Sequence, residues 1–106
     1  MKVLLDECID RRFAREFPGL HIRTVPQMNW AGVKNGELMK LVEVEFDVFI
    51  TVDRNLSYQQ NLPKYDVALI VLRAISNRYE DLKPFAGKVL ESLPNAEPGK
   101  SILISL

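Results

Sequence analysis

The chain has 106 residues, of which 47% are hydrophobic and 26% charged, and its formal net charge is zero. This length and composition predict one small globular domain over residues 1–106. Zero net charge argues against non-specific nucleic-acid binding by the whole surface, although a local basic patch remains compatible with it. The sequence has no apolar run of about 18 residues, which argues against a membrane-spanning helix.

The start of the chain and its cysteine content bear on the compartment in which the protein works. A single Lys followed at once by an apolar strand is not typical of a secretory signal peptide. Cys8 is the single cysteine, so the chain cannot form an internal disulfide. Both observations favour a reducing environment, and we expect a cytoplasmic protein.

The first half of the chain alternates predicted strands and helices. A strand is predicted over Lys2–Leu5, followed by a helix over Ile9–Phe17 with apolar residues at every fourth position. A second strand covers His21–Val25, a loop covers Gln27–Asn35, and a second helix covers Gly36–Glu45. Asn35 is the expected N-cap of this second helix. The residues expected on its inner face are Leu38, Leu41, Val42 and Val44.

The second half continues the alternation. Strands are predicted over Asp47–Thr51 and Val67–Leu72, because near-continuous apolar runs are typical of parallel strands buried on both faces. The polar stretch Asn55–Pro63 is predicted as a short helix and a loop. The longest helix is expected to begin near Asp81, with Pro84 in its first turn, where proline is tolerated.

The chain is predicted to close with an edge strand over Ser101–Leu106. The order of elements predicts an α/β fold, a three-layer α/β/α sandwich with a mainly parallel central sheet. The segments Val67–Leu72 and Ile102–Ile104 are candidates for edge pairing with another chain, which would give a homodimer.

Acidic residues follow two of the predicted strands. Asp6 and Glu7 come directly after the first strand, and Asp53 lies two residues after Thr51, the end of the third. Ligands of parallel sheets collect beyond the carboxyl ends of the strands, so these acids are expected to share one crevice. Clustered carboxylates repel one another and usually persist because a divalent cation or a catalytic proton holds them. The alternative is that Asp6 and Asp53 only cap the helices that follow.

Four short motifs occur in the order Leu4–Glu7, Trp30–Leu38, Ile50–Leu56 and Tyr58–Asn61. In this order they resemble the small PIN-like proteins, relatives of the toxin nucleases of bacterial toxin–antitoxin pairs. Nucleases of that family bind Mg²⁺ or Mn²⁺ through an acid after the first strand, an acid at the start of a middle helix and an acid in a Thr-x-Asp motif. The metal activates water to cut single-stranded RNA.

The resemblance assigns the three metal-binding and catalytic acids to Asp6, Glu37 and Asp53. Asn35 and Asn55 stand where related proteins carry acids, and an amide oxygen supplies less charge to a cation than a carboxylate does. Further candidate site residues are Glu7, Asn35, Thr51 and Asn55.

Basic, aromatic and amide side chains near the same crevice are candidates for RNA contact. Basic residues there would touch phosphates, and a tyrosine would stack on a base; the alternative is an ordinary solvated surface. The candidates are Arg11, Arg12, Lys34, Arg54, Tyr58 and Gln59.

The sequence therefore predicts a metal-dependent endoribonuclease, the toxin of a toxin–antitoxin pair, with single-stranded RNA and an antitoxin protein as partners. The alternative is a PIN-like module of weak or lost catalysis that binds RNA or protein. A phosphotransfer receiver-like domain ranks below both. Such a domain is expected to have a lysine at the end of its fourth strand, where this chain has Leu72 and Arg73.

Overall fold

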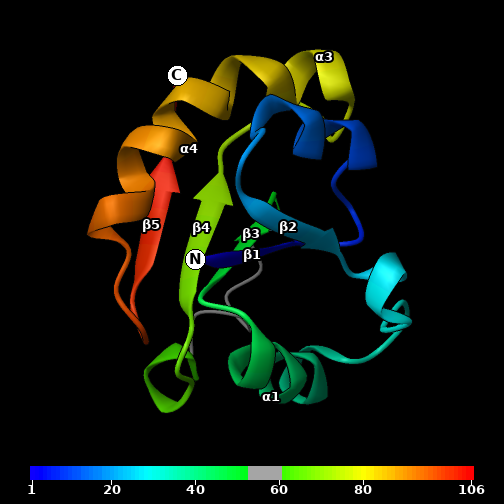
Figure 1. Cartoon of the computed structure of the whole chain (residues 1–106), viewed down its shortest axis with the longest axis vertical. Helices are drawn as coiled ribbons and strands as arrows, with labels where there is room; N and C mark the ends of the chain where they lie inside the picture. The colour runs from blue at the N-terminus through cyan, green and yellow to red at the C-terminus, as the bar shows by residue number, and fades with distance from the viewer. Residues whose placement is uncertain (53–60) are drawn as a thin grey trace.

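The computed structural model describes residues 1–52 and 61–106 and contains a five-stranded sheet in which all paired strands are parallel. The predicted α/β fold with a parallel sheet is confirmed. The strands are β1 (Lys2–Leu5), β2 (His21–Thr24), β3 (Val48–Thr51), β4 (Ala68–Leu72) and β5 (Ser101–Ile104), in the spatial order β2-β1-β3-β4-β5 (Figure 1).

The order of the strands reverses between β1 and β3. The chain leaves β1 to form β2 on one side and then returns past β1 to form β3 on the other. Val3, Leu4 and Leu5 of β1 pair with Val48, Phe49 and Ile50 of β3. In doubly wound sheets such a reversal opens a crevice at the carboxyl ends of the two strands, where ligands bind.

Eight helical segments among the described residues connect or flank the strands. No helix in residues 1–52 and 61–106 is both long and apolar enough to span a membrane. The segments are the 3-10 helices η1 (Arg11–Glu16), η2 (Pro26–Met28), η3 (Leu62–Lys64), η4 (Lys83–Phe85) and η5 (Leu93–Asn95), and the α-helices α1 (Asn35–Glu45), α3 (Tyr79–Leu82) and α4 (Ala86–Ser92).

The side chains of the central strands alternate between two apolar clusters. In β4, Ala68, Ile70 and Leu72 belong to one cluster, and Leu69 and Val71 belong to the other. The first cluster includes buried residues of η1, α3 and α4, whereas the second includes buried residues of α1. All five β4 residues are buried, which explains why this strand appears in the sequence as an uninterrupted apolar run.

The buried face of α1 differs from the expected one. Leu38 and Val42 are buried as predicted, but Met39 completes the buried face. Leu41 and Val44 were expected inside and are 39% and 80% exposed, respectively. At 100° per residue, positions 38, 39 and 42 lie on one side of the helix, and position 44 lies away from it.

The beginning of α1 also differs by one residue. Asn35 was expected to cap the helix from outside, but it is the first helical residue. Lys34 is the N-cap, because its ψ of 151° is extended, and it makes no side-chain capping hydrogen bond.

Two prolines reshape the predicted helices. The helix expected over Ile9–Phe17 is the short 3-10 helix η1, which stops before Pro18, a residue that disfavours helical backbone at the position before it. The long helix expected from Asp81 begins at Tyr79 instead, so Pro84 falls beyond its first turn. Lacking an N–H group, Pro84 divides the segment into α3, η4 and α4.

Candidate functional site

Asp6 follows β1 and is the one acidic side chain that is buried among the described residues, with 4% of its surface exposed. Its backbone N–H donates to the carbonyl of Ile50 in β3 at 2.9 Å, so the residue continues the β1–β3 ladder beyond the end of β1. The first acid of the predicted site therefore lies at the carboxyl ends of β1 and β3, where the sequence analysis expected it.

Both carboxylate oxygens of Asp6 accept hydrogen bonds. The Thr51 hydroxyl donates to Oδ2 at 2.7 Å, and the backbone N–H of Glu7 donates to Oδ1 at 2.8 Å. The Cys8 thiol donates to Oδ2 at 3.6 Å and lies 3.8 Å from the Thr51 hydroxyl oxygen. The structure thus brings together two residues that the sequence analysis selected, Asp6 and Thr51, from strands far apart in the chain.

Burial is the dominant influence on the charge of Asp6. It raises the pKa of this carboxyl above its ordinary value of 3.8, and the hydrogen bonds from Thr51, Glu7 and Cys8 oppose the rise. Burial also raises the pKa of the Cys8 thiol, and the neighbouring charge of Asp6 adds to that effect. Cys8 therefore stays a neutral donor, which disfavours it as a nucleophile because the thiolate is the reactive form.

Glu7 connects the end of β1 to the loop that precedes α1. Its side chain is exposed, and its Oε1 accepts a hydrogen bond of 3.4 Å from the backbone N–H of Gly32. Gly32 has a φ of +81°, a conformation that glycine adopts without the steric cost of a side chain. The acid at the start of the middle helix, Glu37, lies in the first turn of α1 and is exposed. Asn35, two residues earlier, is half-buried.

The third predicted acid and several other candidates lie outside the described residues. In the part of the chain that the structure describes, no three His, Cys, Asp or Glu side chains gather in a way that could hold a metal ion. A ligand set built on Asp6 and Glu37 therefore depends on residues 53–60. The predicted site residues that fall there are Asp53, Arg54, Asn55, Tyr58 and Gln59.

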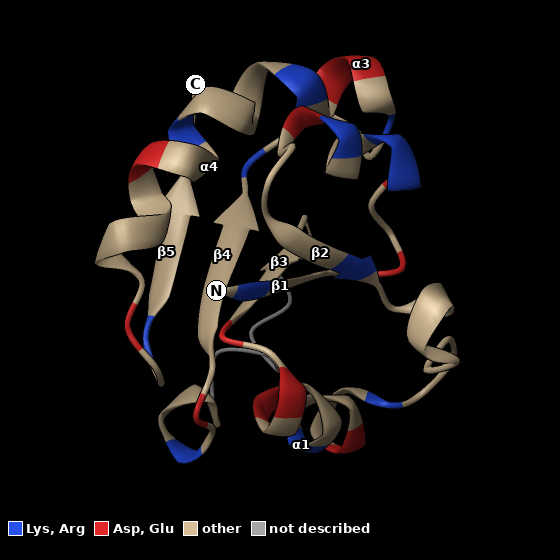
Figure 2. Ribbon diagram, in the orientation of Figure 1, with Lys and Arg blue, Asp and Glu red and all other residues tan. Residues whose placement is uncertain are grey.

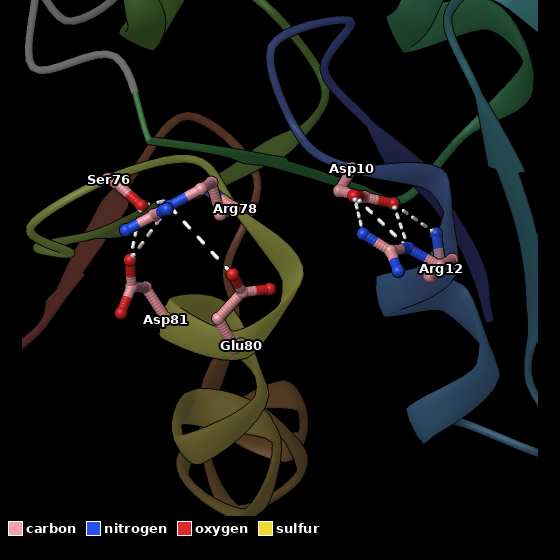
Figure 3. A network of polar contacts seen from close by, with 6 residues as sticks. All are labelled: Asp10, Arg12, Ser76, Arg78, Glu80 and Asp81. Atoms are coloured by element: carbon pink, nitrogen blue, oxygen red, sulfur yellow. Dashed lines mark hydrogen bonds and ion pairs between the residues drawn. The ribbon is translucent and has the colours of Figure 1, made fainter.

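Arg12 is an exposed basic residue whose charge is already paired. Asp10 caps η1 by accepting from the backbone N–H of Arg12 at 2.9 Å, and its carboxylate accepts from the Arg12 guanidinium at 2.7 Å (Figure 3). These hydrogen bonds lower the pKa of Asp10 to about 2. The Arg12 guanidinium also lies 5.1 Å from the centre of the Tyr79 ring. Asp10, and not Asp6, is the cap of this helix.

The other described basic candidates, Arg11 and Lys34, are exposed. Figure 2 shows the basic residues of η1 beside the acidic first turn of α3, so charges of both signs meet at this end of the molecule. The phenol of Tyr79 in α3 donates to the carboxylate of Glu16 in η1 and joins the two helices.

A small cavity of about 230 Å³ is lined by Glu7 and Cys8, the two residues that follow Asp6, and by two residues that the sequence did not indicate. Asn77 and Arg78, from the segment between β4 and α3, line it together with Cys8. The Arg78 side chain turns toward Ser76 and Asp81, and its Nε lies 3.7 Å from the Asp81 carboxylate (Figure 3). No sequence motif joins residues 8 and 78, so only the fold could reveal their proximity.

The larger cavities among the described residues are elsewhere. One of about 590 Å³ lies beyond the carboxyl ends of β4 and β5, between Arg73, Phe85 and Leu106. Neither Asp6 nor Thr51 lines it. We place the candidate site at Asp6 because its carboxylate is buried, accepts a hydrogen bond from Thr51 and lies where the strand order reverses. Comparison of the chain with protein-family models, curated proteins and solved structures finds no match.

Proposed function

We propose that this chain is a metal-dependent endoribonuclease with a PIN-like, three-layer α/β/α form of the parallel-sheet fold. The observation that carries the proposal is the hydrogen bond from Thr51 to Asp6. In the resemblance to PIN-like nucleases, Asp6 corresponds to the first metal-binding acid, and Thr51 is the first residue of the Thr-x-Asp motif. A direct contact between the two is what a shared site requires.

The donor chemistry of the described residues fits a hard divalent cation. Asp6 and Thr51 offer oxygen atoms, the ligands that Mg²⁺ prefers, and the proposed set adds the carboxylates of Glu37 and Asp53. Glu7, Asn35 and Asn55 are further oxygen donors. When bound, the metal would lower the pKa of a water molecule and stabilise negative charge on the scissile phosphate.

The residues of the chain have separate tasks in this proposal. Thr51 fixes the orientation of the Asp6 carboxylate, and its donated hydrogen bond favours the ionised form that a cation needs. Arg11, Arg12, Lys34 and Arg54 position the phosphates of single-stranded RNA, and Tyr58 and Gln59 contact its bases or sugars. The biological setting we propose is a cytoplasmic toxin held in check by an antitoxin protein.

A binding module without catalysis is the second candidate. The observation that favours it is that, in residues 1–52 and 61–106, no three His, Cys, Asp or Glu side chains gather in a way that could hold a metal ion. Asn35 and Asn55 also favour a binding module, because an amide oxygen supplies less charge to a cation than a carboxylate does. In this alternative the fold presents RNA- or protein-binding side chains, and Asp6 is a structural acid that fastens β1 to β3.

The deciding experiment is an RNA-cleavage assay with mixed single-stranded RNA in Mg²⁺, in Mn²⁺ and in a chelator. We expect cleavage only with a divalent ion, and loss of cleavage with retained RNA binding in the Asp6→Asn and Asp53→Asn variants. Asp66→Asn is the matched control. This exposed acid precedes β4, so it lies at the amino ends of the strands, whereas Asp6 lies at their carboxyl ends.

Two outcomes would contradict the enzyme. If the protein binds RNA but never cuts it, the binding module is the better description. If it neither binds nor cuts RNA, both nucleic-acid functions fail.

A further inference from the structure

The sheet ends in β5, whose outer edge has no paired strand among the described residues. Figure 1 shows β5 at one border of the sheet, with α4 drawn beside and partly beyond it in this view. The expectation that the strand Val67–Leu72 could pair with another chain is wrong, because β4 lies between β3 and β5. The expectation for Ile102–Ile104 stands, since this segment lies in the edge strand.

The two edges of the sheet differ in how they are protected. Edge strand β2 carries exposed His21 and Arg23, and the Arg23 guanidinium donates to the carbonyl of Ile22 at 2.9 Å. A charged side chain on an edge strand, such as that of Arg23, discourages pairing with a further strand. The segment Ser101–Leu106 has no charged residue, and Leu103 in its middle is 56% exposed. By this criterion β5 is the edge left open to a partner.

The backbone of β5 is arranged for such pairing. The carbonyls of Lys100 and Ile104 accept hydrogen bonds from the β4 side. Backbone groups alternate in direction along a strand, so those of Ser101 and Leu103 point outward. The Ser105 carbonyl accepts from the Lys88 ammonium at 2.7 Å, and a carbonyl has a second lone pair for another donor.

We propose that the chain forms a two-fold dimer in which β5 pairs antiparallel with β5 of a second copy. With the two-fold axis at Leu103, this residue faces itself, and Ser101 lies opposite Ser105 of the second copy. Ile102 then lies opposite Ile104. Apolar residues meet apolar residues and serines meet serines, so the segment is complementary to itself, as a two-fold interface requires.

Charge on α4 supports a second copy over an unrelated partner. Lys88 of this helix donates to Ser105 next to β5, so α4 follows the same edge. Lys88 and Glu91 of α4 are exposed and three residues apart, so they lie on the same side of the helix. A two-fold axis that passes between residues 89 and 90 of two antiparallel α4 helices places Lys88 of each copy opposite Glu91 of the other. The dimer thus adds two ion pairs beside the joined sheets.

The test is the molar mass in solution, measured by light scattering over a range of protein concentrations. We expect the wild-type protein to have twice the mass of the chain and Leu103→Lys to have the mass of one chain at the same concentration. Val44→Lys, which changes an 80% exposed residue of α1, is the control and should stay dimeric. Circular dichroism of each variant establishes that it is folded.

A charge exchange tests the geometry separately. Lys88→Glu or Glu91→Lys alone should weaken the dimer, and the double variant should restore it. A wild-type protein that is monomeric at all concentrations overturns the proposal. A dimer that survives Leu103→Lys, or a double exchange that restores nothing, overturns it as well, because the copies would then meet elsewhere.

Discussion

The Thr51 hydroxyl donates a 2.7 Å hydrogen bond to Oδ2 of Asp6, across two neighbouring strands and a sequence separation of 45 residues. This bond locks the orientation of a buried carboxylate at the point where the strand order reverses. It makes the first acid of the candidate site a fixed group and not a mobile surface side chain.

The Asp6→Asn variant should be more stable than the wild type at pH 7 without metal. Burial raises the pKa of Asp6 in the folded state, so the native protein binds more protons than the unfolded chain in the pH range between 3.8 and the raised pKa. Wild-type stability therefore falls as the pH rises through the raised pKa, and an uncharged side chain avoids this loss. Thermal unfolding of both proteins from pH 3 to pH 8 should show their difference vanish at the acidic end. A variant that is less stable at every pH would instead assign Asp6 a purely structural role.

The Thr51→Val variant should lose about 1 to 3 kcal/mol of stability, because it removes a donor from a buried carboxylate. Thr51→Ser keeps the hydroxyl and should lose less. Urea unfolding measures both. Equal losses would mean that packing of the methyl group, and not the hydrogen bond to Asp6, is what matters at this position.

Mn²⁺ should raise the unfolding temperature of the wild-type protein, because a ligand that binds only the native state stabilises it. The gain is about 2.7 kcal/mol when the free metal is about 100 times its Kd. Asp6→Asn and Asp53→Asn should show no such gain, whereas Asp66→Asn should show the full one. Differential scanning fluorimetry with and without a chelator makes the comparison. A gain that persists in both acid variants would locate the metal elsewhere.

RNA affinity should depend on the pairing between Asp10 and Arg12. Replacing Arg11 and Arg12 together by Ala should weaken binding and flatten its dependence on salt, because fewer counterions are released. Asp10→Asn should strengthen binding several-fold, because it frees the Arg12 guanidinium for a phosphate. Binding isotherms at several salt concentrations distinguish the two effects. Unchanged affinity in all these variants would remove η1 from the RNA-binding surface.

The strands were predictable from the sequence because burial on both faces leaves a simple pattern. β1 begins and ends where expected, and β4 differs by one residue. The helices were less predictable. Whether Leu41 or Met39 faces the core depends on the rotation of α1 against the sheet, which the local apolar pattern only approximates. Pro84 divides the predicted long helix because the helix begins at Tyr79, earlier than its apolar residues indicated, and the proline therefore falls beyond the first turn.

The candidate site was predictable only in part. The rule that parallel strands end at a common edge anticipated that Asp6 and Thr51 lie together. It did not anticipate that Asp10 would neutralise Arg12, or that Arg78 would reach the same cavity as Cys8. Those contacts depend on loop conformations and on long-range packing. The roles of Glu37 and Asp53 stay predictions.

The all-parallel sheet also determines how the chain must reach its native state. Parallel neighbours cannot be joined by a tight hairpin, and the contact of Leu5 with Ile50 requires the intervening chain to be gathered first. Since closing long loops costs entropy before any ladder bond repays it, we expect slow refolding for a protein of this size. β1 has no strand to pair with until β2 or β3 has been synthesised, so its apolar run Val3–Leu5 stays unpaired during the first part of synthesis. The hydrogen bond between Thr51 and Asp6 would then form late, after the central strands have met.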